Sequence, residues 1–464
     1  MKSYVLELPY ADPAPLFACL QQQSYALFLD SADRSHQDAR YSFICAFPQE
    51  TIEAKNGVIT VRNAHGNDTY EGDPFAVLQD RLSAINLCAD LQDDLPPFQG
   101  GAAGFFGYDL GRGIEEMPSI AADDPGMIDM AIGLYDQVMG FDHARRKRWL
   151  ITHAVDETQA KSKQEHFLKA LDAPAQKTSF SAVEWQSNFS RSAYEQAVQT
   201  IINYIEAGDI FQANLSQRFE AQLPDAFCAY AHYLNMRRTN PAPFAGFMNL
   251  DDIKIASASP ERFLRLEGAR VETRPIKGTA PRSADAAQDE ESKAQLENSA
   301  KDRAENTMIV DLLRNDLSKS CEAPSIIVQD LCKLESFARV HHLVSTVTGT
   351  LRADQSAIDL LRGCFPGGSI TGAPKIRAME IIEELEPMRR GPYCGAMGYI
   401  TPGGSMDTNI LIRTLVYNKG RVSVSAGGGI VYDSDPASEY EETLDKARAI
   451  FESFSQEKTE DIAA

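Results

Sequence analysis

The sequence predicts an α+β fold, because hairpin signals and amphipathic helices alternate along one chain. Residues 408–429 read as two alternating strands joined by Asn418-Lys419-Gly420, a turn sequence typical of hairpins. Residues 254–275 read as a second hairpin, and residues 299–316 between the two carry the pattern of an amphipathic helix. Antiparallel pairs with helices between them favour this class over a doubly wound parallel sheet.

Composition excludes several classes of partner. The 464 residues carry a formal net charge of −21, which disfavours binding to nucleic acid and to anionic membranes. No stretch approaches the roughly 20 apolar residues that span a bilayer, and no basic region followed by an apolar run opens the chain. The eight cysteines form no C-x-x-C pair, which favours reduced, buried thiols. We therefore expect a cytoplasmic protein that binds no nucleic acid and no membrane, and that needs local positive charge for any anionic substrate.

The chain divides into three parts by composition and by the pattern of apolar and polar residues. Residues 1–155 show short strands separated by turn signals, and the expected strands are 25–30, 41–47, 57–63 and 145–155. A polar stretch, residues 156–187, reads as a solvated helix at 157–172 followed by a linker. The texture changes at residue 188, so we expect a second domain over residues 188–457.

Capping signals place two helices in this second domain. Ser190 is a candidate N-cap, and Gly208 is a plausible stop for the helix between them. Residues 210–223 then read as a strand. Asp435 is a candidate N-cap for the last helix, residues 436–454, because Pro436 suits the first helical position.

Two glycine-rich segments are candidate ligand loops. Residues 365–375 have the glycine spacing of a phosphate-binding loop, but Ala373-Pro374 stand where that motif needs Lys and Ser or Thr. Residues 425–430 follow a strand and contain three successive glycines, which allow a ligand to approach the backbone closely. Either loop alone could be a tight turn, whereas two of them in one half of the chain favour a ligand.

Charged residues in two helices could form a metal site. Glu305 shares a helix face with Ile309 and Leu312, so its carboxylate needs a partner or a metal ion. Glu442 and Lys446 share one face of the last helix, where a solvated salt bridge is the alternative. Two carboxylates from separate helices, with water and an anionic substrate, are typical of Mg²⁺ if the helices meet.

Lys277 and Glu261 are candidates for nucleophile and acid/base. Arg274 or a bound cation would depress the pKa of Lys277 and expose a neutral amine, although the residue could also be an exposed lysine in a turn. Glu261 could instead be a surface residue or a salt-bridge partner of Arg262. Only one side chain of His341-His342 can face a given side of a strand, and a structural histidine is the alternative for each.

Nine ordered blocks closely resemble the chorismate-utilising enzymes, which include anthranilate, aminodeoxychorismate, isochorismate and salicylate synthases. The blocks are SPERF, TRPIKGT, NSAKDRAENTMIVDLLRND, HHLVSTV, CFPGGSITGAPKIRAMEIIEELEP, GPYCGAMGY, MDTNILIRTL, SAGGGIV and EYEETLDKA. RYSFI and FQGGAAGFFGYDLGR resemble the family's N-terminal region. The resemblance implies an anthranilate synthase component I-like fold of two packed antiparallel sheets flanked by helices, with the N-terminal segment interwoven.

The resemblance also implies roles for individual residues. Lys277 would act as a covalent nucleophile and Glu261 as the general acid/base. Glu305 and Glu442 would bind Mg²⁺, which holds the ring carboxylate of chorismate. The implied substrate-binding residues are Gly278, Thr279, His342, Ser369, Tyr393, Arg413, Gly427, Gly428, Gly429 and Lys446.

Two positions divide the family by reaction. Water-using members carry a lysine where this chain has Gln212, and glutamine cannot take a proton. Anthranilate synthases generally show PIAGT where this chain has PIKGT, the form of one large subgroup of aminodeoxychorismate synthases. The resemblance therefore implies that chorismate and ammonia are converted to 4-amino-4-deoxychorismate through a lysine-bound intermediate, in 4-aminobenzoate and folate biosynthesis.

Partners and alternatives follow from the same resemblance. No cysteine stands in a nucleophile-elbow context, so we expect ammonia from solution or from a separate glutaminase subunit in a heterodimer. The alternatives are anthranilate synthase component I of tryptophan biosynthesis and a non-catalytic chorismate-binding subunit. A tryptophan pocket is implied at Ser31, Arg40, Tyr41, Ser42, Pro243 and Phe244, but LFLDSAD departs from the pattern of an inhibitory site, which counts against it.

Overall fold

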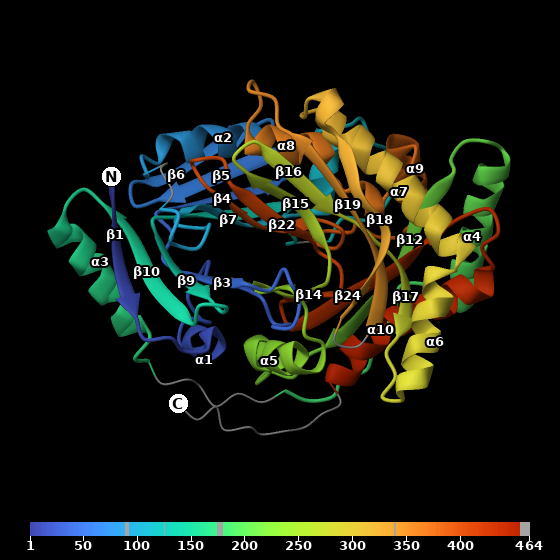
Figure 1. Cartoon of the computed structure of the whole chain (residues 1–464), viewed down its shortest axis with the longest axis horizontal. Coiled ribbons are helices and arrows are strands. Elements are labelled where there is room, and N and C mark those ends of the chain that lie inside the picture. The colour runs from blue at the N-terminus through green and yellow to red at the C-terminus, as the bar shows by residue number, and fades with distance from the viewer. Residues whose placement is uncertain (89–91, 125, 174–179, 338–339, 455–464) are drawn as a thin grey trace.

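The computed structural model describes residues 1–88, 92–124, 126–173, 180–337 and 340–454. Its core is a pair of antiparallel sheets, here called sheet A and sheet B, with helices on their outer faces (Figure 1). The predicted α+β class with two packed antiparallel sheets is confirmed. The expected linker segment 174–179 and residues 455–457 lie outside the described residues.

The strands of both sheets are given in their spatial order. Sheet A contains β1 (Lys2–Leu8), β10 (Lys147–Ala154), β9 (Gln137–Asp142), β3 (Tyr41–Cys45), β2 (Leu27–Asp30), β13 (Phe244–Leu250), β14 (Ile253–Ser259), β23 (Thr414–Asn418), β24 (Arg421–Ile430), β12 (Gln212–Gln222) and β11 (Gln186–Ser187), and β20 (Gly372–Ala373) also pairs with β12. Sheet B contains β17 (Ile276–Pro281), β19 (Val340–Thr350), β16 (Arg270–Arg274), β15 (Arg262–Glu267), β22 (Met406–Ile410), β21 (Ala396–Ile400), β7 (Gly101–Phe106), β8 (Met130–Tyr135), β4 (Glu50–Lys55), β5 (Val58–Asn63) and β6 (Gly66–Glu71), and β18 (Ile327–Ser336) also pairs with β19.

Strands from the first and last parts of the chain are neighbours in both sheets. In sheet A, β2 pairs with β13, and in sheet B, β7 pairs with β21. Residues 1–155 and the described part of the expected second domain therefore share both sheets rather than forming separate layers.

Helices cover the outer face of each sheet. They are α1 (Pro13–Ala18), α2 (Pro74–Ala84), α3 (Glu157–Ala170), α4 (Arg191–Glu206), α5 (Ala229–Thr239), α6 (Ala286–Glu297), α7 (Ala300–Ser318), α8 (Ala357–Cys364), α9 (Lys375–Leu385) and α10 (Pro436–Ser453), with short 3-10 turns η1 (Tyr108–Gly113), η2 (Ala323–Ser325) and η3 (Gly368–Ile370). In Figure 1, α2 and α8 lie along the upper side and α1 and α5 along the lower side. Apolar side chains fill the space between the sheets, for example Leu27 and Ile255 of sheet A against Phe105 and Met397 of sheet B. Separate apolar clusters join each sheet to its helices.

The expected helix boundaries are confirmed by their caps. The Ser190 side chain accepts a hydrogen bond from the Ala193 amide at the start of α4, and Gly208 after that helix has a φ of 83°. The Asp435 side chain accepts from the Ser438 amide at the start of α10. These caps satisfy amides that have no partner within their own helix.

The chain changes sheets at two places where the sequence predicted one continuous strand pair. The hairpin expected over 254–275 is wrong, because β14 ends in sheet A and β15 begins in sheet B, and only β15 and β16 form a hairpin. The strand expected before Asn418 is likewise two strands, β22 in sheet B and β23 in sheet A. The turn itself is confirmed, because Asn418 pairs with Arg421 and Gly420 has a φ of 77°. The two crossings bring Glu261 and Arg413 to the boundary between the sheets.

The structure bears on two expectations from composition, one about membrane-spanning segments and one about the cysteines. None of the described helices is long and apolar enough to cross a membrane. All eight cysteines lie among the described residues and none forms a disulfide; five are buried and three are partly exposed, so the expectation of burial holds for most of them.

Candidate active site

Lys277 and Glu305 form the ion pair at the centre of the site. Lys277 lies on β17 opposite Leu343 of β19, and helix α7, which carries Glu305, packs against both strands. Lys277 Nζ lies 2.9 Å from Glu305 Oε1, and only 14% and 16% of the two side chains are exposed. Burial would lower the pKa of Lys277, but the carboxylates around it, Glu305 foremost, raise that pKa above its usual value. Burial would raise the pKa of Glu305, but the Lys277 ammonium lowers it.

Gln212 is the second partner of Glu305. Its Nε2 atom donates to Glu305 Oε1 at 2.9 Å, and the side chain is fully buried. An amide here offers a donor but no base, whereas a lysine at this position could accept a proton from water. The site therefore contains no water-activating lysine on this strand.

Glu261 is a buried carboxyl group at the crossing from β14 to β15. Ser369 Oγ donates to Glu261 Oε1 at 2.7 Å. Burial raises the pKa of Glu261 to about 7, although the Ser369 hydrogen bond and the nearby Lys277 ammonium lower it. Arg262 points elsewhere and pairs with Asp407 at 3.0 Å, so the alternative of a salt bridge between Glu261 and Arg262 is wrong. A carboxyl group with such a pKa can both take and give a proton near neutral pH.

The three glycines of β24 let carboxylates from two helices approach one stretch of backbone. A Cβ atom on Gly428 would lie 3.2 Å from Glu442 Oε1. A Cβ atom on Gly429 would lie 2.9 Å from Glu305 Oε1 and 1.9 Å from Gln212 Nε2. Any side chain at Gly429 would therefore displace the groups that line the site, which explains why glycine is needed there.

Two cations lie beside these glycines. Lys446 Nζ donates to the Gly427 carbonyl at 3.0 Å and pairs with Glu442. Arg413, at the crossing from β22 to β23, donates to the Lys446 carbonyl, and its guanidinium forms no ion pair with any described residue. Burial lowers the pKa of Arg413, while nearby Tyr393 acts against that shift. A partly buried guanidinium that forms no ion pair with the described carboxylates is suited to bind a carboxylate of a ligand.

His342 is the histidine that faces this site. Its Nδ1 atom lies 3.0 Å from Thr279 Oγ1 and 3.2 Å from the Gly278 carbonyl. Burial lowers the pKa of His342 to about 4, and the nearby Arg413 charge lowers it further against the opposing effect of the Gly278 carbonyl. His341 points the other way, toward α6. The sequence prediction that only one of the two faces a given side is confirmed.

The interpretation of Arg274 as a cation beside Lys277 is wrong. Arg274 pairs instead with Asp38 and Glu335. The groups that set the pKa of Lys277 are therefore carboxylates, and they favour an ammonium rather than a neutral amine.

The carboxylate oxygens beside Gly428 and Gly429 are of the kind that bind a hard cation. Within the described residues no three His, Cys, Asp or Glu side chains form a metal-binding cluster. The implied ligands are Glu305 and Glu442, and Glu439 also lies at Gly428. Mg²⁺ is commonly held by one or two carboxylates together with water and substrate oxygens. The buried side-chain oxygens of Gln212 and Asn214 in the same region also have no hydrogen-bond partner.

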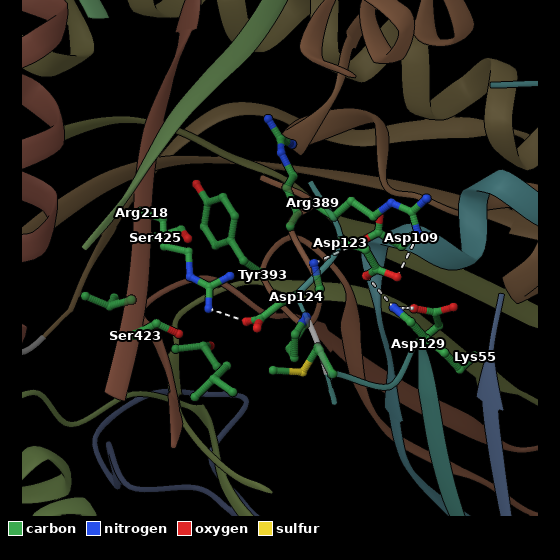
Figure 2. Close-up of a pocket in the computed structure, with 17 residues that line it drawn as sticks. Lys55, Asp109, Asp123, Asp124, Asp129, Arg218, Arg389, Tyr393, Ser423 and Ser425 are labelled. Carbon is green, nitrogen blue, oxygen red and sulfur yellow. Dashed lines mark hydrogen bonds and ion pairs between the residues drawn. The ribbon is translucent and has the colours of Figure 1, made fainter. Parts of the chain in front are cut away.

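A small cavity of about 20 Å³ lies beside Tyr393. Figure 2 shows Tyr393 near Arg218 and Ser425, with Lys55 paired to Asp129 on the other side. The cavity can hold one water-sized molecule. Tyr393 is the one residue of the implied substrate set that lines it.

A second cavity of about 500 Å³ lies at the implied tryptophan pocket. Of the six implied residues, five line the cavity: Ser31, Arg40, Tyr41, Pro243 and Phe244. Ser42 is buried behind them and donates its hydroxyl to Asp30 at 3.3 Å. The cavity is large enough for an amino acid.

Sequence reasoning missed three residues beside the site. Asn214 lies on β12 two residues after Gln212, and its Nδ2 donates to the Ser369 carbonyl at 3.0 Å. The spacing of two along a strand could have placed it on the same face. Glu386 and Arg390 form a buried ion pair that touches this region, and no local pattern separates them from surface charges.

Known proteins are similar to this chain along nearly its whole length. Residues 25–452 match the sequence model of the family described as chorismate binding enzyme. Aminodeoxychorismate synthase component 1 of Klebsiella aerogenes is 44% identical over 96% of this chain and 98% of its own length. Anthranilate synthase component 1 of Thermus thermophilus is 39% identical over 92% and 91% of the two chains.

A solved structure supports the same relationship. Anthranilate synthase component I from Streptococcus pneumoniae superimposes with a TM-score of 0.80 at 35% identity, covering 89% of this chain and 92% of that one. Because the family model spans most of the chain and relatives align almost from end to end, the chain belongs to the chorismate binding enzyme family.

Proposed function

We propose that this protein converts chorismate and ammonia to 4-amino-4-deoxychorismate. The observation that carries the proposal is the placement of Lys277, whose amine lies 2.9 Å from Glu305 and beside the protonatable Glu261. A lysine in this position supplies a nucleophile, and the adjacent carboxyl group supplies a proton. The relatives named aminodeoxychorismate synthase component 1, at 43–44% identity, support this choice.

The reaction proceeds in two substitutions. One proton passes from the Lys277 ammonium to the Glu261 carboxylate, which gives a neutral amine and a neutral acid together. The amine forms a bond to C2 of the ring, the two conjugated ring double bonds shift toward C4, and the C4 hydroxyl leaves as water with the proton from Glu261. Ammonia then bonds to C4, the bond from C2 to Lys277 breaks, and Glu261 takes the extra proton from the new amine. The sum is chorismate plus ammonia giving the 4-amino product plus water.

Magnesium fits the two carboxylates that converge on β24. Glu305 and Glu442 would hold the ion, and the ring carboxylate of chorismate would complete its coordination. When bound, Mg²⁺ supplies positive charge that fixes and polarises this carboxylate. Arg413 and Lys446 bind the second carboxylate of the substrate, so local cations offset the net charge of −21.

Ammonia comes from a separate glutaminase subunit in this proposal. The relatives carry the designation component 1, which supports a second component for this chain as well. The reaction would then serve the synthesis of 4-aminobenzoate and folate in the cytoplasm. Tryptophan remains a candidate ligand of the 500 Å³ cavity, and isothermal titration of the purified protein with tryptophan tests it.

Anthranilate synthesis is the second candidate function. It is favoured by relatives of that name at 39% identity, and it places nitrogen at C2 with loss of pyruvate. It needs no covalent lysine, so it leaves the position of Lys277 without a role. Water-using reactions lack support, because Gln212 cannot accept a proton.

One assay separates the two amination products. The purified protein is incubated with chorismate, Mg²⁺ and ammonium, and the lyase that releases 4-aminobenzoate is added to half of the sample. We expect 4-aminobenzoate only with the lyase, no fluorescent anthranilate, and loss of product on Lys277→Ala but not on Lys293→Ala at the surface of α6. Anthranilate formed without the lyase would refute the proposal. A mass increase on Lys277 in the quenched reaction tests the covalent intermediate directly.

A further inference from the structure

Glu386 and Arg390 form a buried ion pair behind the active site. Glu386 caps the C-terminal end of α9, and Arg390 precedes the turn that contains Tyr393. Arg390 Nε donates to Glu386 Oε2 at 2.9 Å and Nη2 donates to Oε1 at 2.7 Å. Only 3% of the Arg390 side chain and 5% of the Glu386 side chain are exposed.

The pair fills a gap at the edge of β12. That edge bonds to β20 at Gln212 and Ala213 and to β11 at Phe219 and Glu220, and no strand in the described part of the chain pairs with the residues between them. In this gap the Ser216 amide and hydroxyl both donate to Glu386 Oε1 at 2.8 Å. Arg390 Nη2 donates to the Asn214 carbonyl at 2.7 Å. The ion pair therefore takes the place of a missing strand.

The same guanidinium reaches the loop that carries Ser369. Arg390 Nη1 donates to the Ile370 carbonyl at 3.0 Å, one residue after Ser369. The Asn214 side chain donates to the Ser369 carbonyl, so Arg390 binds the backbone of Asn214 and of Ile370, the two residues that adjoin Ser369 in space and in sequence. The guanidinium also lies 5.8 Å from the centre of the Tyr393 ring.

A contribution to the free energy of unfolding does not by itself explain why Glu386 and Arg390 form a buried ion pair. Removing two charges from water is costly, and replacement of a buried pair by apolar side chains of similar volume is often neutral for stability. Three of the contacts instead fix backbone groups, at Ser216 and Asn214 of β12 and at Ile370. Ile370 follows Ser369, whose hydroxyl binds the acid Glu261. We propose that Glu386 and Arg390 are positioning residues that hold Ser369 in hydrogen-bond contact with Glu261. The assay of this proposal rests on the proposed function, although the positional claim does not.

The test replaces both charges at once, by Glu386→Leu with Arg390→Met, so that no unpaired charge stays buried. We expect a folded protein whose kcat falls about 100-fold, because a displacement of about 1 Å at a catalytic group costs roughly that factor. The KM for chorismate should change by less than about threefold. Ser369 stabilises the Glu261 carboxylate, so its loss should move the acidic limb of the pH profile up by about one pH unit.

A double-mutant cycle with Ser369→Ala identifies the contact. If both changes act through the same hydrogen bond, their effects on kcat and on the acidic limb are not additive. The matched control is Arg377→Met with Glu380→Leu, which removes a more exposed ion pair of α9 that contacts neither β12 nor the Ser369 loop. We expect that control to leave kcat and the pH profile unchanged.

Three results would overturn the proposal: a folded double variant with parental kcat and pH profile, additive effects with Ser369→Ala, or an equal effect of the control. If the double variant does not fold, Arg390→Lys tests the same point, because one ammonium cannot reproduce the planar set of contacts. Hydrogen exchange of residues 212–216 and 365–374 needs no substrate. Unchanged exchange in the variant refutes positioning, whereas an inactive parent with changed exchange in the variant refutes only the proposed function.

Discussion

Replacement of Lys277 by methionine should tighten Mg²⁺ binding while it removes amination at C4. The ammonium lies 2.9 Å from Glu305 Oε1, so it occupies a carboxylate of the proposed metal site. At an effective dielectric constant of about 20, that contact has a gross Coulomb energy of about 6 kcal/mol. Desolvation offsets most of it and leaves roughly 1–3 kcal/mol. Each ~1.4 kcal/mol corresponds to a factor of ten, so we expect Mg²⁺ to bind about 10- to 100-fold more tightly.

The assay is isothermal titration of the metal-free protein with Mg²⁺ in the absence of chorismate. Lys293→Met, a surface change on α6, is the matched control and should bind Mg²⁺ as the parent does. Turnover to 4-amino-4-deoxychorismate should fall by roughly 10³-fold or more in Lys277→Met, because a covalent nucleophile is lost. Unchanged or weaker Mg²⁺ binding would refute the competition at Glu305, and undiminished amination would refute the covalent route.

Three further results are expected. Glu305→Gln should abolish Mg²⁺-dependent turnover, and a variant that retains parental activity would contradict the metal role. The pH profile of kcat/KM should fall below about pH 7, because Glu261, whose pKa burial raises to about 7, is then protonated and cannot accept the proton of Lys277; a profile flat from pH 5.5 to 8 would argue against this relay. Gly429→Ala should raise the KM for chorismate and cost about 1–3 kcal/mol of unfolding free energy, because the new Cβ lies 1.9 Å from Gln212 Nε2; denaturation and kinetics that match the parent would show that the backbone yields there.

Local signals were sufficient for the secondary structure at several places. Ser190 and Asp435 cap the helices that they were expected to cap, and the turn at Asn418-Lys419-Gly420 joins two strands as predicted. Capping and turn geometry depend on a few adjacent residues, so the sequence carries them directly. The burial of Glu305 with a partner was also predictable, because its neighbours on the helix face are apolar.

The two changes of sheet had no local signal. Alternation of apolar and polar residues looks the same on both sides of Pro260 and of Leu411, so one continuous strand pair was the natural prediction. The error matters for the site, because the crossings are what bring Glu261 and Arg413 to it. The partner of Arg274 also had no local signal, because its side chain forms an ion pair with Asp38, a residue in the N-terminal part of the chain.

The sequence by itself determined the fold class, the caps and the resemblance that named Lys277 and Glu305 as site residues. Only the tertiary structure decided that these two side chains form an ion pair, that Gln212 binds the same carboxylate, and that Ser369 donates to Glu261. The physical reason is that caps and periodicity depend on neighbours in the chain. A carboxylate's partner and pKa depend instead on sheet register and burial, which groups distant in sequence set together.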